Sequence, residues 1–236
     1  MKTIGLIGGM SWESTVTYYQ VINEAVRKQL GGLHSARILI HSIDFSELAR
    51  AQEADDWNTC AKIMIEAGRS LEAAGADFIL IGANTMHIVY EELCHALSVP
   101  VLHIADATIS RLKKDGIQRT ALLGTKYTLC RDFYKQKIVD SGIEVLIPED
   151  HIESLNSIIY DELCMGIITE ASKQKLLSMI KELKDNAAQS VILGCTELDL
   201  LVKQEDLDIP VYDTTQIHGI KRISRYNMIS SRLHSA

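Results

Sequence analysis

Short apolar runs alternate with longer segments of helical period along the whole chain. The runs that favour strands lie near 3–9, 36–43, 77–83, 99–104, 119–124, 143–147, 190–195 and 209–212. Between them the apolar residues recur every three or four positions, which predicts helices near 13–30, 57–74, 86–96, 106–115, 128–141, 152–164, 170–187 and 216–230. This alternation is typical of an α/β fold with mostly parallel sheets covered by helices.

The second half of the chain repeats features of the first. The segment Leu6-Ile7-Gly8-Gly9 matches Leu122-Leu123-Gly124-Thr125, and Ile81-Gly82-Ala83-Asn84-Thr85 matches Leu193-Gly194-Cys195-Thr196-Glu197. A tyrosine follows each glycine turn at the same distance, as Tyr18 and Tyr134. A general likeness between strand-helix units is the alternative explanation. We interpret the pattern as two similar lobes.

The repeat predicts how the lobes are divided and where a ligand binds. We expect one lobe over 1–97 plus 210–236 and the other over 98–209, related by a pseudo-twofold axis. Open parallel sheets bind ligands at the carboxyl ends of their strands. The active site is therefore expected in the cleft between the lobes, with positions 83 and 195 facing each other.

Composition excludes several classes of function. The net charge of −7 and the lack of a basic stripe argue against nucleic acid as a partner. No apolar run approaches the roughly 18 residues that a membrane span requires. The five cysteines are scattered, without CxxC or Cys/His metal spacing, so we expect no metal site and a reducing, cytoplasmic environment.

The most reactive candidate is Cys195, on a turn that follows an apolar strand. Backbone N–H groups at a turn that opens a helix stabilise negative charge, so the pKa of this thiol could be lowered toward neutrality. A thiolate of this kind serves as a base or a nucleophile. The alternative is an inert, buried cysteine.

Two further turns carry polar or flexible residues. Asn84 and Thr85 follow Ala83 and can donate hydrogen bonds to a carboxylate, although helix capping is the more usual role of both residue types. The glycine-rich turn before Met10 lacks the spacing of a dinucleotide or phosphate loop. It suits either a small anionic ligand or a tight connection without one.

The remaining candidates are weaker. The histidines His41, His87 and His103 fall beside strand ends, where a hydrogen-bonded core role is more usual than proton transfer. Three aspartates, Asp44, Asp106 and Asp213, also follow strands and are expected to cap the next helix.

Taken together, the segments IGLIGGMSWEST, GANTMH, LLGTKYT and GCTEL resemble the aspartate/glutamate racemase family in order and spacing. The form of the first segment, with HSIDF and HIADAT, looks most like the branch that includes broad-specificity amino-acid racemases. The resemblance implies a cofactor-independent isomerase that moves a proton at the α-carbon of an amino acid. It also implies a small-molecule substrate and a homodimer.

The resemblance assigns roles to individual residues. It implies that Cys195 is one of two opposed acid/base groups. The second group belongs at the first position of a C-N-T or T-N-T motif, which is Ala83 here. The implied substrate contacts are Met10, Gln52 in the loop after the second strand, Asn84, Thr85, Thr125, Thr196 and Glu197. Some relatives bind a distal carboxylate of the substrate with a lysine near this position, but no lysine lies around 163–166 here. The resemblance therefore does not imply an acidic substrate.

Ala83 leaves three interpretations open. The chain is a racemase whose inversion is impaired or lost because a two-base reaction lacks one partner. Alternatively, it uses one thiol to decarboxylate or isomerise a dicarboxylate, as some members of the wider superfamily do. A third possibility is a catalytically silent protein that binds an amino acid.

Overall fold

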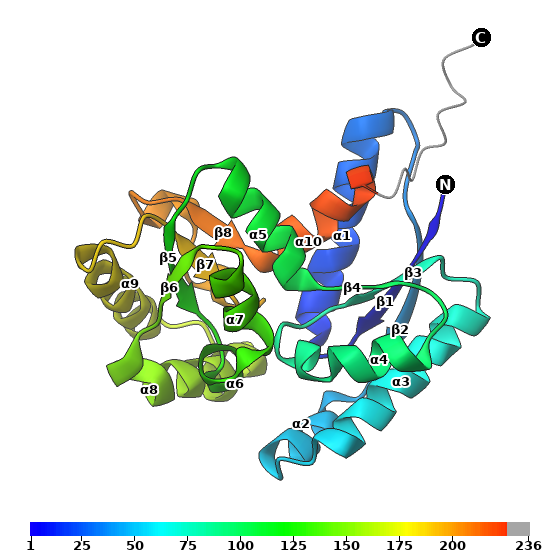
Figure 1. Cartoon of the computed structure of the whole chain (residues 1–236), viewed down its shortest axis with the longest axis horizontal. Coiled ribbons are helices and arrows are strands. Elements are labelled where there is room, and N and C mark those ends of the chain that lie inside the picture. Colours follow the sequence, from blue (N-terminus) through cyan, green and yellow to red (C-terminus); the bar gives the residue numbers. More distant parts are fainter. Residues whose placement is uncertain (226–236) are drawn as a thin grey trace. The chain divides into compact units, whose positions relative to one another are not determined.

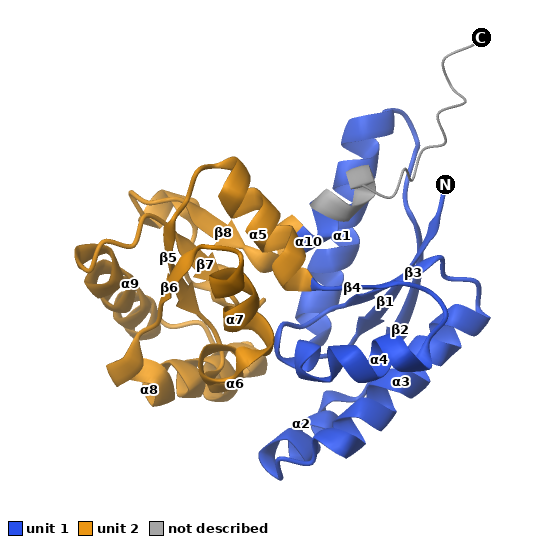
Figure 2. Cartoon of the chain, in the orientation of Figure 1, with its two compact units in different colours: residues 1–103, 218–236 blue, residues 104–217 orange. Residues whose placement is uncertain are grey.

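A computed structural model describes the backbone of residues 1–225 and the side chains of residues 1–220. The chain forms two compact units, one of Met1–His103 with the segment from His218 onward and one of Ile104–Ile217 (Figure 2). Each unit contains a four-stranded parallel sheet with helices packed on it (Figure 1). The predicted α/β class with two similar, parallel-sheet lobes is confirmed.

The two sheets have the same strand order. The first sheet runs β2-β1-β3-β4, with β1 (Thr3–Gly8), β2 (Arg37–Ser42), β3 (Phe78–Ile81) and β4 (Val101–Leu102). The second runs β6-β5-β7-β8, with β5 (Arg119–Leu123), β6 (Glu144–Leu146), β7 (Val191–Leu193) and β8 (Val211–Asp213). All eight predicted strands are present, and the shared order is the structural counterpart of the sequence repeat.

Helices connect successive strands. The first unit contains α1 (Trp12–Leu30), α2 (Phe45–Glu53), α3 (Trp57–Ala73), the 3₁₀ helix η1 (Thr85–Val89) and α4 (Tyr90–Ala96). The second unit contains α5 (Ile104–Lys114), α6 (Lys126–Cys130), α7 (Asp132–Asp140), η2 (Glu149–His151), α8 (Ile152–Ser157), the π-helical η3 (Ile158–Glu162), η4 (Leu163–Met165), α9 (Glu170–Asp185), η5 (Leu198–Leu200) and η6 (Gln204–Asp206). Finally, α10 (Thr214–Arg225) passes from the second unit into the first.

Several helix predictions need correction. The helix expected near 152–164 is α8 followed by η3 and η4, and the one expected near 86–96 is η1 followed by α4. The pattern missed α2, which is short and begins at a capping aspartate. The single helix expected over 128–141 is two helices, because Arg131 is extended (φ −101°, ψ 155°) between α6 and α7. The helix expected near 216–230 begins at Thr214, and its expected end lies outside the described residues.

Alternating residues of the first sheet build two apolar layers. One layer packs Ile7, Ile79 and Ile81 against residues of α3, and the other packs Ile4, Leu6, Phe78 and Leu80 against residues of α1. Strands buried on both faces read as continuous apolar runs. This explains why the sequence located the strands so directly.

The unit boundaries differ from the expected ones. The chain passes between units after His103 and after Ile217, whereas the sequence placed the divisions after 97 and 209. The pairing of strands accounts for the difference: β4 pairs with β3 in the first sheet, and β8 pairs with β7 in the second. Both end strands are very short, so their apolar pattern does not reveal their partners.

The matched tyrosines are both fully buried, each within its own unit. The Tyr18 hydroxyl lies 3.0 Å from Nδ1 of His218, and the Tyr134 hydroxyl donates to Oγ1 of Thr108 at 3.3 Å. His218 lies on α10, which follows the last strand of the second sheet, and Thr108 lies on α5, which follows the last strand of the first. Each tyrosine therefore anchors the helix that enters its unit from the other sheet.

None of the helices in the described part of the chain is long and apolar enough to cross a membrane.

Candidate functional site

The glycine turn after β1 is shaped by close backbone contacts. Gly9 has φ of +89°, and a Cβ there would lie 2.2 Å from the carbonyl oxygen of Ile43. Its N–H donates to Oγ1 of Thr15 at 2.8 Å. Glycine is required at this position because only a residue without Cβ accepts both the conformation and the contact. Met10 follows directly and is buried.

The turn after β3 holds the next three predicted residues. The Gly82 N–H donates to the carbonyl of Ile7 at 2.8 Å, and a Cβ on Gly82 would lie 2.9 Å from that oxygen. Ala83, Asn84 and Thr85 follow, all buried. Since β1 and β3 are neighbours, this turn and the glycine turn share one edge of the first sheet.

Gln52 lies in α2 and not in a loop, so that expectation was wrong. Asp44 caps the helix by accepting from the N–H of Ser46 at 3.0 Å, as predicted for this aspartate. The buried Gln52 amide donates from Nε2 to Sδ of Met86 at 3.0 Å. This contact attaches α2 to the segment that follows Asn84 and Thr85.

The second unit repeats the arrangement of the β3 turn. The Gly194 N–H donates to the carbonyl of Leu123 at 2.7 Å, and a Cβ on Gly194 would lie 2.8 Å from that oxygen. Cys195 comes next, as Ala83 follows Gly82, and each of the two residues is 8% exposed. The sequence match between the two positions thus corresponds to the same place in each sheet.

Thr125 lies at the same edge of the second sheet as Cys195. It follows β5, the neighbour of β7, and its hydroxyl caps α6 by accepting from the N–H of Thr128 at 3.3 Å. The buried Thr125 hydroxyl also lies 3.3 Å from the Thr128 hydroxyl. The second unit therefore gathers Thr125, Cys195, Thr196 and Glu197 at one sheet edge.

The thiol of Cys195 is hydrogen-bonded to a carboxylate. Its Sγ donates to Oε2 of Glu197 at 2.9 Å, and the Thr196 hydroxyl donates to the same oxygen at 2.8 Å. Glu197 is only 4% exposed. One carboxylate oxygen thus accepts from both of the residues that precede it.

Burial raises the pKa of the Cys195 thiol well above its ordinary value, and the charge of Glu197 raises it further. The expected lowering toward neutrality was therefore wrong. The turn opens a 3₁₀ helix of only three residues, Leu198–Leu200, which offers little of a helix dipole, and a negative charge lies beside the thiol. The raised pKa agrees with the hydrogen bond in which the thiol is the donor.

Two neighbours of the thiol were missed by the sequence motifs. Tyr160 and Cys164 pack against the apolar cluster that includes Cys195, and burial raises the pKa of the Tyr160 hydroxyl. Tyr160 lies on η3 and Cys164 on η4, some thirty residues before Cys195. No motif spacing connects such distant positions; only the folded unit brings them together.

Some of the weaker candidates have the structural roles expected of them. Asp213 accepts from the N–H of Thr215 at 2.8 Å at the start of α10, and His87 is a buried, hydrogen-bonded residue. Asp106 does not cap α5; it lies inside its first turn and pairs with Lys137 at 3.6 Å. The described residues contain no group of three His, Cys, Asp or Glu side chains that could hold a metal ion.

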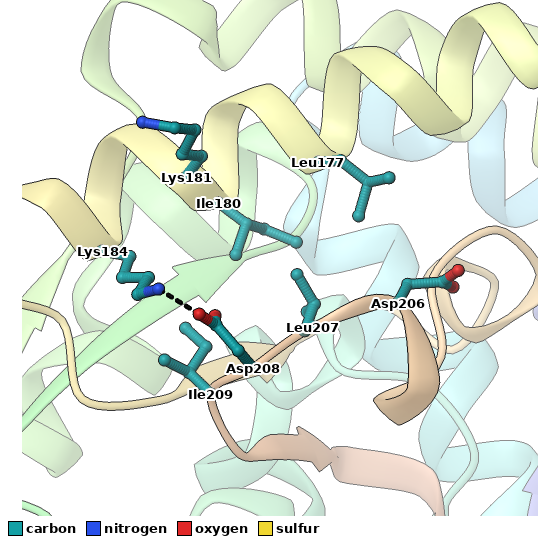
Figure 3. Close-up of a pocket in the computed structure, with 8 residues that line it drawn as sticks. All are labelled: Leu177, Ile180, Lys181, Lys184, Asp206, Leu207, Asp208 and Ile209. Carbon is teal, nitrogen blue, oxygen red and sulfur yellow. Dashed lines mark hydrogen bonds and ion pairs between the residues drawn. The ribbon is translucent and has the colours of Figure 1, made fainter.

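A separate groove of about 360 Å³ lies beside α9 in the second unit (Figure 3). Leu177, Ile180, Leu207 and Ile209 supply its apolar lining, and Lys184, which also lines it, pairs with Asp208. None of the predicted site residues lines it. We therefore place the candidate site at the sheet edges and not in this groove.

Two parallel sheets of identical order, each with a glycine-led polar turn at its carboxyl edge, define a two-lobed α/β protein. A solved Asp/Glu racemase structure has the same architecture. The chain belongs to the Asp/Glu/Hydantoin racemase family, whose profile matches residues 7–219.

Individual relatives agree with this assignment. The chain is 26% identical over 230 residues to the broad specificity amino-acid racemase RacX of Bacillus subtilis, and the match covers 94% of this chain and 97% of that one. A crystal structure of a putative Asp/Glu racemase from Yersinia pestis is 48% identical with a TM-score of 0.86, covering 94% of this chain and 97% of the other. An aspartate racemase homologue from Pyrococcus horikoshii is 37% identical with a TM-score of 0.81, covering 94% and 98%. The suspected family is confirmed.

Proposed function

We propose that this protein exchanges the α-proton of an amino acid without a cofactor, with Cys195 as the acid/base group. The observation that carries the proposal is the hydrogen bond from the Cys195 thiol to Glu197 at the carboxyl edge of the second sheet. A buried thiol needs a proton acceptor before it can act as a base, and the carboxylate at 2.9 Å provides one.

Four proton transfers complete the exchange. Glu197 accepts the thiol proton, and the Cys195 thiolate then removes the α-proton, so that the electron pair of the C–H bond moves into an enediolate. The new thiol returns a proton to the α-carbon, and Glu197 then gives its proton back to the thiolate, which restores the starting state. Exchange of the thiol proton with water between these steps introduces a solvent hydrogen into the amino acid.

Other residues are proposed to bind the substrate. Asn84, Thr85 and Thr196 would hold the α-carboxylate, since amide N–H and hydroxyl groups suit an anionic oxygen and stabilise the enediolate as charge develops. We assign Met10, Gln52 and Thr125 to the surroundings of the substrate. This assignment supposes that the turns of both units serve one substrate, which is part of the proposal.

Ala83 makes the proposed reaction one-sided. Its methyl group cannot give or take a proton, although it follows Gly82 as Cys195 follows Gly194. Loss of a general acid or base costs about 10²–10⁴-fold in rate. We therefore expect exchange at the face that meets Cys195 to exceed inversion.

Each enantiomer of aspartate, glutamate and several neutral amino acids is incubated in deuterated water, and the α-proton is followed by NMR. Exchange of one enantiomer without inversion supports the proposal, and Cys195→Ser should abolish it. Because Ala83 leaves a single thiol, an arylmalonate and maleate are included. Turnover of either without α-proton exchange would favour a one-thiol decarboxylase or isomerase. Amino-acid binding without any turnover would indicate a silent binding protein.

We also propose that the protein is a cytoplasmic homodimer. The five cysteines are not joined in disulfides, and such a set suits a reducing compartment. Trp12, Val16 and Tyr19 form an exposed apolar stripe along α1 that a second copy could cover. Light scattering gives the oligomeric state, and Val16→Glu should produce a monomer if this stripe is the interface.

A further inference from the structure

The imidazole of His87 is bonded to the backbone of the turn that contains Ala83 and Asn84. Its Nδ1 lies 3.0 Å from the carbonyl oxygen of Ala83 and 3.2 Å from that of Asn84. Both oxygens are acceptors, so Nδ1 carries the hydrogen and donates to them. The backbone N–H of His87 also donates to the Asn84 carbonyl, at 3.0 Å.

Packing fixes the orientation of this ring. His87 is 1% exposed. Its ring is stacked on Tyr90, with centroids 6.3 Å apart and planes 18° apart, and lies 4.6 Å from the ring of His103. A side chain held in this way has little rotamer freedom. Its hydrogen bonds therefore hold the two carbonyl groups of the turn in fixed positions.

The matching turn of the second unit is held differently. The residue that corresponds to His87, at the same offset that relates Ala83 to Cys195, is Asp199. Its carboxylate is partly exposed and pairs with Lys203 at 2.5 Å. The Cys195 carbonyl accepts from the backbone N–H of Leu198 at 3.2 Å. Each turn therefore has its own side-chain partner: Glu197 at the Cys195 thiol, and His87 at the backbone around Ala83.

We propose that His87 is a positioning residue that holds the turn from Gly82 to Thr85 in the shape that presents Asn84 and Thr85 to the substrate carboxylate. Fixing two successive carbonyls fixes the peptide planes on either side of Asn84, and with them the direction of its side chain. The part of this inference that concerns substrate rests on the proposed function.

The test uses three variants of the full chain. His87→Leu removes the donor. His87→Asn keeps an N–H donor at the same number of bonds from the backbone. Tyr90→Phe is the matched control, because it removes a different hydrogen bond, the one from the Tyr90 hydroxyl to the Val101 carbonyl at 3.1 Å. If His87→Leu does not fold, His87→Gln takes its place, since its amide is one methylene further out.

Two quantities are measured: amide hydrogen exchange at residues 84–89 in the ligand-free protein, and amino-acid affinity by calorimetry. Loss of the donor should reduce protection of the turn and raise Kd, each about tenfold, as for one buried hydrogen bond. His87→Asn should restore both, and Tyr90→Phe should change neither.

Wild-type protection of the amides at residues 84–89 in His87→Leu would overturn the inference. Failure of His87→Asn to restore lost protection would also overturn it, because the packing of the ring would then be the cause. Weaker binding with unchanged protection would also overturn it, because His87 would then act on substrate directly. If the wild-type protein binds no amino acid, the proposed function fails. Protection that is lost in His87→Leu and restored in His87→Asn would still support His87 as the residue that holds the turn.

Discussion

Replacing Glu197 by Gln separates two effects that this carboxylate has on Cys195. The substitution removes the negative charge at 2.9 Å from Sγ but keeps a side chain of the same size that can bond to Thr196. The charge of Glu197 raises the pKa of the thiol, so its removal should lower that pKa and increase the fraction of thiolate.

The magnitude follows from the single contact. A hydrogen bond to a charged group contributes about 1.5–3 kcal/mol, which corresponds to roughly 10–150-fold in an equilibrium. Alkylation of Cys195 by iodoacetamide at neutral pH should therefore accelerate by about tenfold or more in Glu197→Gln. In the same variant, α-proton exchange should slow by about 10²–10⁴-fold, because the acceptor of the thiol proton has been lost.

The two measurements move in opposite directions only if Glu197 accepts the proton. If it acts solely through its charge, a more abundant thiolate should exchange the α-proton faster. Exchange in Glu197→Gln at or above the wild-type rate would thus refute the reasoning. Glu205→Gln is the control, because it removes an exposed carboxylate from the same unit and should alter neither rate.

Three further predictions concern single residues. Ala83→Cys or Ala83→Thr should increase inversion, followed by polarimetry, by about 10²-fold or more because the second face regains a proton donor; no gain in either variant would contradict the one-sided mechanism. Burial raises the pKa of Asp213 to about 6, whereas an aspartate in the unfolded chain has a pKa of about 3.9. Between about pH 4 and 6 the folded protein holds a proton that the unfolded chain releases, so the free energy of unfolding falls as the pH rises. In urea unfolding, Asp213→Asn, whose oxygen can still accept from Thr215, should be more stable than wild type by up to about 3 kcal/mol at pH 7 and equal to it below pH 4; a constant difference would exclude this titration. Tyr18→Phe should cost about 1 kcal/mol by losing the bond to His218, whereas a change no larger than that of the exposed Tyr19→Phe would show that this bond is not stabilising.

The fold was predictable because its signals are strong and local. Strands such as Phe78–Ile81 and Val191–Leu193 are buried throughout, and their apolar runs stand out between helices of clear period. What could not be predicted depends on pairing across long distances. Val101–Leu102 belongs to the first sheet because it forms hydrogen bonds with β3. Two apolar residues alone do not predict which sheet such a strand joins.

The site was predictable to a smaller extent. Motif position located the turns of Ala83 and Cys195, because glycine must precede each one where the neighbouring strand's carbonyl would lie within 3 Å of any added Cβ. The ionisation of the thiol was not predictable in this way. Its pKa depends on burial and on the orientation of the Glu197 side chain, and the local sequence predicts neither of them.

The two turns show how little of the chemistry the backbone itself determines. Gly82 and Gly194 make the same hydrogen bond to the neighbouring strand, at 2.8 and 2.7 Å, and the next residue in each unit has the same small exposure. The difference lies in the side chains: a thiol with a carboxylate partner in one unit, and a methyl group with a backbone-holding imidazole nearby in the other. A fold that supplies two equivalent positions allows either to change independently, so the family's architecture does not by itself predict inversion here. The balance between exchange and inversion should instead follow the identity of residue 83, and a variant at that one position, with the rest of both turns unchanged, is the most direct measure of how far the second group contributes.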